Sequence, residues 1–447
     1  MSQSEQTTSD LLSYIHQSPT PFHCVATSVK LLEENGFSQL QEGEGWKLEE
    51  GGTYYVVRDG ALVAFRVGSQ PASSAGFRLL GAHTDSPNLR IKPQADLNEK
   101  GYDQLGVEVY GGLLTYTWLD RDLGLAGKVV LSGDDSPSQI TSRLLWIDRP
   151  MLRVPSLAIH LNRDYRTEGL KLNNQSHMAP ILGLSEDSGD DSKKKSQEST
   201  LAKMLGQELG VDPERVLSWD LSLVDVTPPA LGGMNNEFIF SPRLDNQAMC
   251  HASLMALLRT TKETGDKAPL ATSVVGLYDH EEVGSGSTSG AAGSITEDIL
   301  YRIAEVEGPG ASSGGFARAV AHSLQVSADM AHAIHPNYTD RHEPKHLPLI
   351  NQGPVIKINT QQRYATCSEG AALFEAWCRE LEVPYQKFVT RTDLACGSTI
   401  GPISAARTGI KTVDVGNPML SMHSIREQAG SHDPERMVQI MNRFLQH

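Results

Sequence analysis

Short apolar runs that break into loops carrying histidine or carboxylate side chains constrain the fold of this chain more than any other feature. Four runs have this form, and they lead into His83, the stretch 279–282, Asp329 and His423. Segments with helical spacing of apolar residues lie between these runs, as in 250–258 and 374–381, and after the last of them, at 437–445. Strands that alternate with helices predict an α/β fold with a mixed, mainly parallel sheet flanked by helices.

The middle of the chain has a different pattern. Residues 106–150 contain four strand-like pieces with little helix between them: GVEVYGG, LLTYTWLD, LAGKVVLSG and SRLLWIDRP. This pattern predicts a separate β-rich module inserted into the α/β fold. Residues 185–200 form a charged, low-complexity stretch that we expect to be a solvated loop.

Charge and cysteine content exclude several classes of protein. The 39 basic and 54 acidic residues give a net charge of −15, which argues against nucleic acid or an anionic membrane as a partner. No apolar run approaches the ~20 residues that cross a bilayer, and the first residues do not resemble a signal peptide. The five cysteines contain no CxxC pair, so neither a disulfide framework nor a Cys-ligated metal site is expected. We therefore expect a soluble, cytoplasmic protein with reduced thiols.

The polar residues at the strand ends can meet although they are far apart in the chain, because ligands bind at the carboxyl ends of strands in open α/β sheets. Mixed histidine and carboxylate ligands suit Zn²⁺ or another divalent transition metal. Two adjacent metals need a shared carboxylate and roughly five or six protein ligands. The available side chains are His83, Asp85, Asp245, Asp279, His280, Glu281, Glu282, Asp329, His332 and His423.

Each of these residues also has a purely structural interpretation. His83 and Asp85 could belong to a turn, Asp245 could cap a helix, and His423 could be a surface histidine. Glu281 and Glu282 are harder to explain in this way, since adjacent carboxylates at a buried strand end repel each other. A metal ligand beside a proton shuttle is the better hypothesis, and the occurrence of all these segments in one chain favours a metal site.

The chain resembles the aspartyl aminopeptidase family of co-catalytic zinc metallopeptidases along nearly its whole length. The motifs that carry the resemblance are GAHTDSP, RLDNQ, DHEEVGS, SADMAHAIHPNY, GPVIKINTQQRYAT and SMHSIRE, in this order. The resemblance implies that each subunit holds two Zn²⁺, with Co²⁺ or Mn²⁺ as alternative metals. The implied roles are His83 and Asp329 on one metal, Glu282 and His423 on the other, Asp245 bridging both, Glu281 as general base, and Asp85 as the partner that orients His83.

The resemblance also implies a domain organisation and a substrate. Residues 1–92 and 232–447 would form the catalytic domain, of zinc-exopeptidase type, and 93–231 a β-rich dimerisation or lid domain. The enzyme would remove an N-terminal Asp or Glu from peptides and assemble from dimers into a dodecamer. Lys357 would bind the acidic side chain, with His332 and Tyr364 lining the pocket. His160 would reach the active site of a neighbouring subunit and stabilise the oxyanion, although a histidine in an apolar run is more commonly a core residue.

Two other functions remain open at this point. An N-acyl amino-acid deacylase could use the same metal ligands, and peptide and N-acyl substrates would separate the two activities. A non-catalytic metal-binding scaffold is the third hypothesis. Glu281 argues against it, because a structural metal site needs no spare base beside Glu282.

Overall fold

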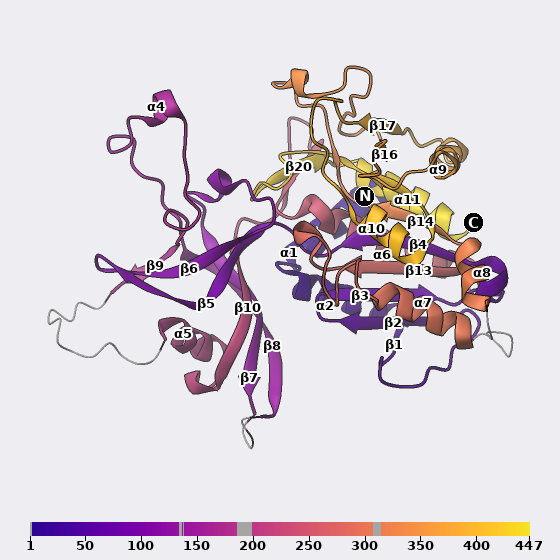
Figure 1. Ribbon diagram of the computed structural model, residues 1–447, viewed down its shortest axis with the longest axis horizontal. Coiled ribbons are helices and arrows are strands. Elements are labelled where there is room, and N and C mark those ends of the chain that lie inside the picture. The colour runs from indigo at the N-terminus through magenta and orange to yellow at the C-terminus, as the bar shows by residue number, and fades with distance from the viewer. Residues whose placement is uncertain (1, 134–135, 137, 186–198, 307–313) are drawn as a thin grey trace. The chain divides into compact units, whose positions relative to one another are not determined.

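Contacts along the chain define two compact units in the computed structural model, which describes residues 2–133, 136, 138–185, 199–306 and 314–447 (Figure 1). The unit called outer here, because it contains both ends of the sequence, combines Met1–Ser86, Pro229–Met422 and Arg426–His447. The unit called inner, because it is inserted within that sequence, combines Pro87–Pro228 with His423–Ile425. The sequence predicts limits of 93 and 231 for the inserted module, and its assignment as a dimerisation or lid domain stays a prediction. Most of the charged stretch 185–200 lies outside the described residues.

A nine-stranded mixed sheet forms the centre of the outer unit. Four adjacent strands in its middle are parallel: β13, β4, β14 and β18. Asp59 and Gly60 form the turn of a hairpin, since β2 and β3 pair antiparallel on either side of them. In spatial order the strands are β1 (Ser38–Gln39), β2 (Thr53–Arg58), β3 (Ala61–Arg66), β13 (Thr272–Tyr278), β4 (Phe77–His83), β14 (Leu324–Ala328), β18 (Lys411–Gly416), β16 (Val355–Ile358) and β17 (Gln386–Val389).

Helices cover both faces of this sheet because its strands are apolar on both sides. Leu80 and Ala82 of β4 pack in a core with α1 (Gln3–His16), α2 (Pro21–Glu34), α6 (Leu244–Thr264), α9 (Ser368–Glu380) and α11 (Asp433–Leu445). Phe77 and Leu79 of the same strand pack in a second core with α3 (Ala72–Ala75), α7 (Ile295–Val306), α8 (Gly315–Ala321) and α10 (Ile400–Thr408). The predicted α/β fold with a mixed sheet between helices is confirmed.

A smaller five-stranded sheet completes the outer unit. Its strands, in spatial order, are β11 (Ala230–Gly232), β12 (Phe238–Ser241), β20 (Glu427–Gly430), β19 (Pro418–Leu420) and β15 (Ala331–His332). The antiparallel pairing of β12 with β20 sets Ser241 opposite Glu427. This register brings Glu427 close to the start of α6.

The inner unit contains a six-stranded antiparallel sheet around its own apolar core. The predicted β-rich character is present, but LLTYTWLD is not a strand: Thr115–Trp118 form a 3₁₀ turn. The strands in spatial order are β8 (Ile140–Leu152), β7 (Leu123–Ser132), β10 (Val216–Asp225), β5 (Asn88–Glu99), β6 (Tyr102–Tyr110) and β9 (Ile181–Leu184), and the helices are α4 (Tyr165–Glu168) and α5 (Thr200–Leu209).

Two further observations bear on the predicted class of protein. All five cysteines are free thiols. None of the helices in the described ranges has the length and apolar character that crossing a bilayer requires.

Candidate metal centre

His83 is the last residue of β4 and lies at the middle of the candidate site. Its side chain is buried, and Nδ1 donates a hydrogen bond to the carbonyl oxygen of Asp85 at 3.0 Å. That bond leaves Nε2 to face the carboxylates, at 3.4 Å from Asp245 and 3.7 Å from Asp329. A histidine held through Nδ1 in this way presents the Nε2 lone pair that metal ions bind.

Asp245 reaches the site because the start of α6 is irregular. Arg243 has a left-handed backbone conformation, and Asp245 has φ −81° and ψ 104°, which are not helical values. The Asp245 N–H donates to the Glu427 carboxylate at 3.0 Å, and the Asp245 carbonyl accepts from the Ser86 hydroxyl at 2.6 Å. The predicted position of Asp245 at a helix N-terminus is confirmed, but the residue is no ordinary helix cap.

Glu281 and Glu282 lie in a 3₁₀ turn (Glu281–Val283) that directly follows β13 and Asp279–His280. The first N–H groups of such a turn lack partners within it. Here the Asp85 carboxylate accepts both, at 3.1 Å from Glu281 N and 3.1 Å from Glu282 N. Asp85 therefore orients His83 through its carbonyl group and holds the two glutamates through its carboxylate.

Three side chains form a group that could hold a metal ion. Each of these residues offers one ligand atom, and the three atoms lie within 4.8 Å of one another; the residues are His83, Asp245 and Glu282. Asp329 follows the neighbouring strand β14, and its carboxylate lies near both His83 and the Lys357 ammonium, 3.7 Å and 3.8 Å away. The parallel order of β13, β4 and β14 explains why residues from three distant segments meet at one end of the sheet.

The electrostatics of this cluster suit a cation. Burial alone would lower the pKa of His83, but hydrogen bonding to Asp245, Asp329 and Asp85 raises that pKa well above its ordinary value. Burial raises the pKa of Glu281 to about 8, and the neighbouring aspartates add to this although the His83 charge opposes it. Several carboxylates around one imidazole form a nitrogen and oxygen donor set that fits zinc. The residues present therefore fit a zinc site.

Comparison with known proteins identifies the family. The family model described as "Aminopeptidase I zinc metalloprotease (M18)" matches residues 14–445. The "Probable M18 family aminopeptidase 2" of Stutzerimonas stutzeri is 47% identical over 437 residues, which cover 97% of this chain and 96% of that protein. The chain belongs to the M18 family of zinc aminopeptidases. It is therefore a zinc-dependent peptide hydrolase, and the resemblance found in the sequence is confirmed.

Solved structures agree with this assignment. The structure of the Ape4 and Nbr1 complex matches with a TM-score of 0.94 and 38% identity, covering 99% of this chain and 86% of that chain. The yeast mApe1 dodecamer matches with a TM-score of 0.85 and 29% identity, covering 99% and 97%. The fold of this M18 aminopeptidase is thus shared along its whole length.

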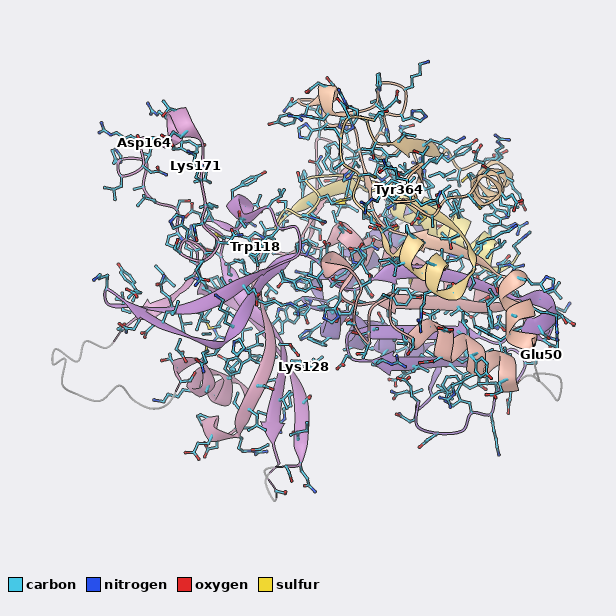
Figure 2. All side chains as sticks on the ribbon, in the orientation of Figure 1. Glu50, Trp118, Lys128, Asp164, Lys171 and Tyr364 are labelled. Carbon is cyan, nitrogen blue, oxygen red and sulfur yellow. The ribbon has the colours of Figure 1, made fainter. Side chains whose placement is uncertain are left out.

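Two predicted site residues belong to the inner unit of the M18 aminopeptidase. His423 Nδ1 donates to the Gly112 carbonyl at 3.0 Å, a backbone contact of the same kind as that of His83 Nδ1. His160 is exposed in the loop before α4, and Figure 2 labels Asp164 and Lys171, which precede and follow that helix in the chain. The interpretation of His160 as a core residue is wrong, because the apolar run around it is exposed as well: Leu157, Ile159 and Leu161.

The predicted substrate-binding residues lie beside a cavity of about 310 Å³ in the outer unit. His332, Tyr364 (labelled in Figure 2) and Phe388 are among its lining residues. The rings of His332 and Tyr364 both pack edge-on against Phe388. Lys357 is not among the lining residues. Its ammonium lies 5.2 Å from the centre of the Tyr364 ring and donates to the Met330 carbonyl at 3.2 Å.

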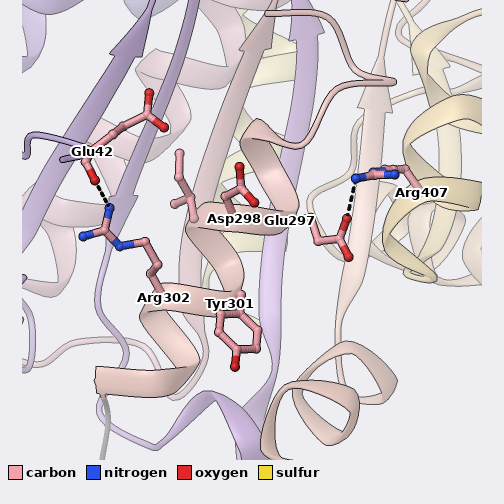
Figure 3. A pocket seen from close by; sticks show the side chains of 7 residues that line it. Glu42, Glu297, Asp298, Tyr301, Arg302 and Arg407 are labelled. Carbon is pink, nitrogen blue, oxygen red and sulfur yellow. Dashed lines mark hydrogen bonds and ion pairs between the residues drawn. The ribbon is translucent and has the colours of Figure 1, made fainter. Parts of the chain in front are cut away.

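A second cavity, of about 550 Å³, lies against α7 and contains no candidate catalytic residue (Figure 3). Arg407 forms an ion pair with Glu297 at 2.9 Å, and Arg302 donates to the backbone carbonyl of Glu42 at 2.8 Å. We assign no chemistry to it.

Glu427 is the residue at the site that the sequence did not single out. Its side chain is 2% exposed and contacts the backbone of Asp245. The available signal was the presence of an acidic residue in the SMHSIRE motif, four residues after His423. Only the folded register of β12 and β20 reveals its partner.

Proposed function

We propose that this M18 aminopeptidase removes N-terminal Asp or Glu from peptides, using two Zn²⁺ per subunit. The observation that carries the proposal is the cluster in which Nε2 of His83 lies within 4 Å of Asp245, Glu281 and Asp329. A structural zinc site needs no spare base, whereas here the Glu281 carboxylate lies beside the proposed ligands. The deacylase and scaffold alternatives receive no support from the comparisons.

The proposed ligands divide between two metals. His83 and Asp329 would hold one ion, Glu282 and His423 the other, and Asp245 would bind both. Zinc, when bound, supplies Lewis acidity for the scissile carbonyl and for the attacking water. Co²⁺ or Mn²⁺ would fit the same nitrogen and oxygen donors.

Glu281 is the proposed general base. Its carboxylate is mostly buried, and Oε2 lies 3.9 Å from Nε2 of His83, next to the proposed metal ligands. Burial raises the pKa of Glu281 and so makes its ionised carboxylate a stronger base, which would take a proton from water and deliver it to the leaving amine. The backbone bonds from Glu281 and Glu282 to Asp85 keep both side chains directed to the same place.

Lys357 is the proposed partner of the acidic substrate side chain, with His332 and Tyr364 lining the pocket. A charge of −15 gives the protein no general attraction for acidic peptides. The preference therefore needs a local cation, and Lys357 is a buried one beside the Tyr364 ring. Its contact with Tyr364, which lines the 310 Å³ cavity, supports the proposal.

The assembly proposal rests on the relatives and on the inner unit. Yeast mApe1 forms a dodecamer in its solved structure. We propose that this chain also forms a dodecamer from dimers, with no nucleic-acid or membrane partner, and that His160 completes the active site of a neighbouring copy. The exposed apolar residues around His160 support such a contact. A cytoplasmic location is consistent with five free thiols.

The decisive experiment measures kcat/KM over substrates that differ only in the N-terminal residue, together with zinc content on the same sample. The proposal expects a strong preference for Asp and Glu, two zinc ions per chain and no cleavage of N-acyl amino acids. A preference for neutral residues would refute the proposed specificity. One zinc per fully active chain would refute the two-metal mechanism.

A further inference from the structure

The backbone around Asp245 depends on side chains from elsewhere in the chain. The N–H groups at a helix start have no intrahelical acceptor. In α6 the start is also irregular, with Arg243 left-handed and with Asp245 and Asn246 outside helical geometry. Local structure therefore does not determine where the Asp245 carboxylate points.

Two side chains hold the peptide groups on either side of Asp245. Glu427, at the first position of β20, accepts the Asp245 N–H at 3.0 Å, and Ser86 donates to the Asp245 carbonyl at 2.6 Å. Both side chains are buried, with 2% and 7% of their surfaces exposed. The side chain held between them faces Nε2 of His83 at 3.4 Å.

We propose that Glu427 is a positioning residue that fixes Asp245 for metal binding and thereby sets the zinc affinity of the site. The inference rests on the proposed role of Asp245 as a metal ligand. A buried carboxylate is costly unless its oxygens accept hydrogen bonds, and one of the bonds that Glu427 accepts comes from the N–H of the proposed ligand itself. Groups that orient metal ligands typically contribute about 10–100-fold to metal affinity.

A purely structural role for Glu427 is the competing explanation. Glu427 lies opposite Ser241 in the β12–β20 pair, and Ser241 precedes Asp245 by four residues. On this explanation the only role of Glu427 is to stabilise the pairing of the two strands. That role would change the melting temperature alone. The positioning role changes the metal site itself.

The test uses purified enzyme and measures the zinc dissociation constant by competition with a chromophoric chelator. The visible absorption spectrum of the Co²⁺-substituted protein is recorded as well. Glu427→Ala should weaken zinc binding about 10–100-fold and alter the Co²⁺ spectrum. Glu427→Gln should restore much of the affinity, because its amide oxygen can still accept the Asp245 N–H.

Glu435→Ala is the matched control. Glu435, on α11, is a similarly buried carboxylate with 4% of its surface exposed. It pairs with Arg259 of α6 at 2.8 Å and is not part of the candidate metal site. This variant should lose stability and keep wild-type zinc affinity. If Glu427→Ala does not fold, Glu427→Asp decides, because it keeps the charge and withdraws the oxygen by one methylene.

Wild-type zinc affinity and an unchanged Co²⁺ spectrum in Glu427→Ala, or in Glu427→Asp where the alanine variant does not fold, would overturn the inference. Asp245→Ala separates this outcome from failure of the proposed function. Zinc loss in Asp245→Ala with normal binding in the Glu427 variant removes only the positioning role. Full zinc binding by Asp245→Ala would remove the proposed ligand assignment as well.

Discussion

Replacing Lys357 with methionine tests the proposed specificity most directly. The side chain is 2% exposed, and methionine fills a similar volume without the charge. The ammonium donates to the Met330 carbonyl at 3.2 Å and lies 3.8 Å from the Asp329 carboxylate. Removing it should therefore abolish the attraction for an acidic substrate side chain and also disturb Asp329.

The size of the expected loss of selectivity follows from the burial of Lys357. Removing one partner of a buried charge pair costs about 3–5 kcal/mol. At about 1.4 kcal/mol per factor of ten, the selectivity for N-terminal Asp over Ala should fall by two orders of magnitude or more. The readout is the ratio of kcat/KM for the two substrates, since any loss of metal caused by the change at Asp329 affects both equally.

Lys387→Met provides the matched control. Lys387 lies on the neighbouring strand β17, its side chain is 42% exposed, and it pairs with Glu375 at 2.7 Å. Its loss should leave the selectivity ratio unchanged. An unchanged ratio in Lys357→Met, with zinc content confirmed, would show that another group selects acidic residues.

Three further predictions concern the base, the oligomer and acid stability. Glu281→Gln should retain its zinc, since Glu281 is not a proposed ligand, and lose about 10²–10⁴-fold in kcat; near-normal turnover would contradict the role. His160→Ala should keep its melting temperature because the side chain is exposed, yet lose activity, and fully active monomers would exclude a contribution from a neighbouring copy. Burial lowers the pKa of His251 to about 4, so the unfolded chain binds its proton more tightly and stability should fall as the pH drops from about 6.5 towards 4. His251→Leu should reduce that loss in thermal unfolding measured across this pH range, and an identical pH dependence in both proteins would refute the linkage.

The sequence predicts the convergence of strand ends because the physics there is simple. Parallel strands bring their carboxyl ends to one edge, and β13, β4 and β14 are neighbours in the sheet. His83, Glu282 and Asp329 meet for that reason. The periodicity of apolar residues also predicts α6, α9 and α11.

Contacts that depend on loop closure could not be predicted in the same way. The orientation of Asp245 depends on hydrogen bonds to Ser86 and Glu427, which are 159 and 182 positions away in the chain. Thr115–Trp118 has the composition of a strand but forms a 3₁₀ turn. Strand propensity depends on tertiary packing, which the local sequence does not reveal. Exposure of the apolar residues near His160 is likewise a property of the folded inner unit.

Asp85 explains why two motifs that look independent in the sequence occur together. The sequence assigns it only to the orientation of His83, and its carbonyl does accept the Nδ1 hydrogen bond. Its carboxylate accepts the N–H groups of Glu281 and Glu282, nearly 200 residues further along the chain. The Asp85 carboxylate adds negative charge beside the two glutamates, but it accepts both N–H groups that the turn leaves without partners and so fixes the turn next to His83. The metal cluster is therefore held together through the backbone as well as through the proposed metal ligands.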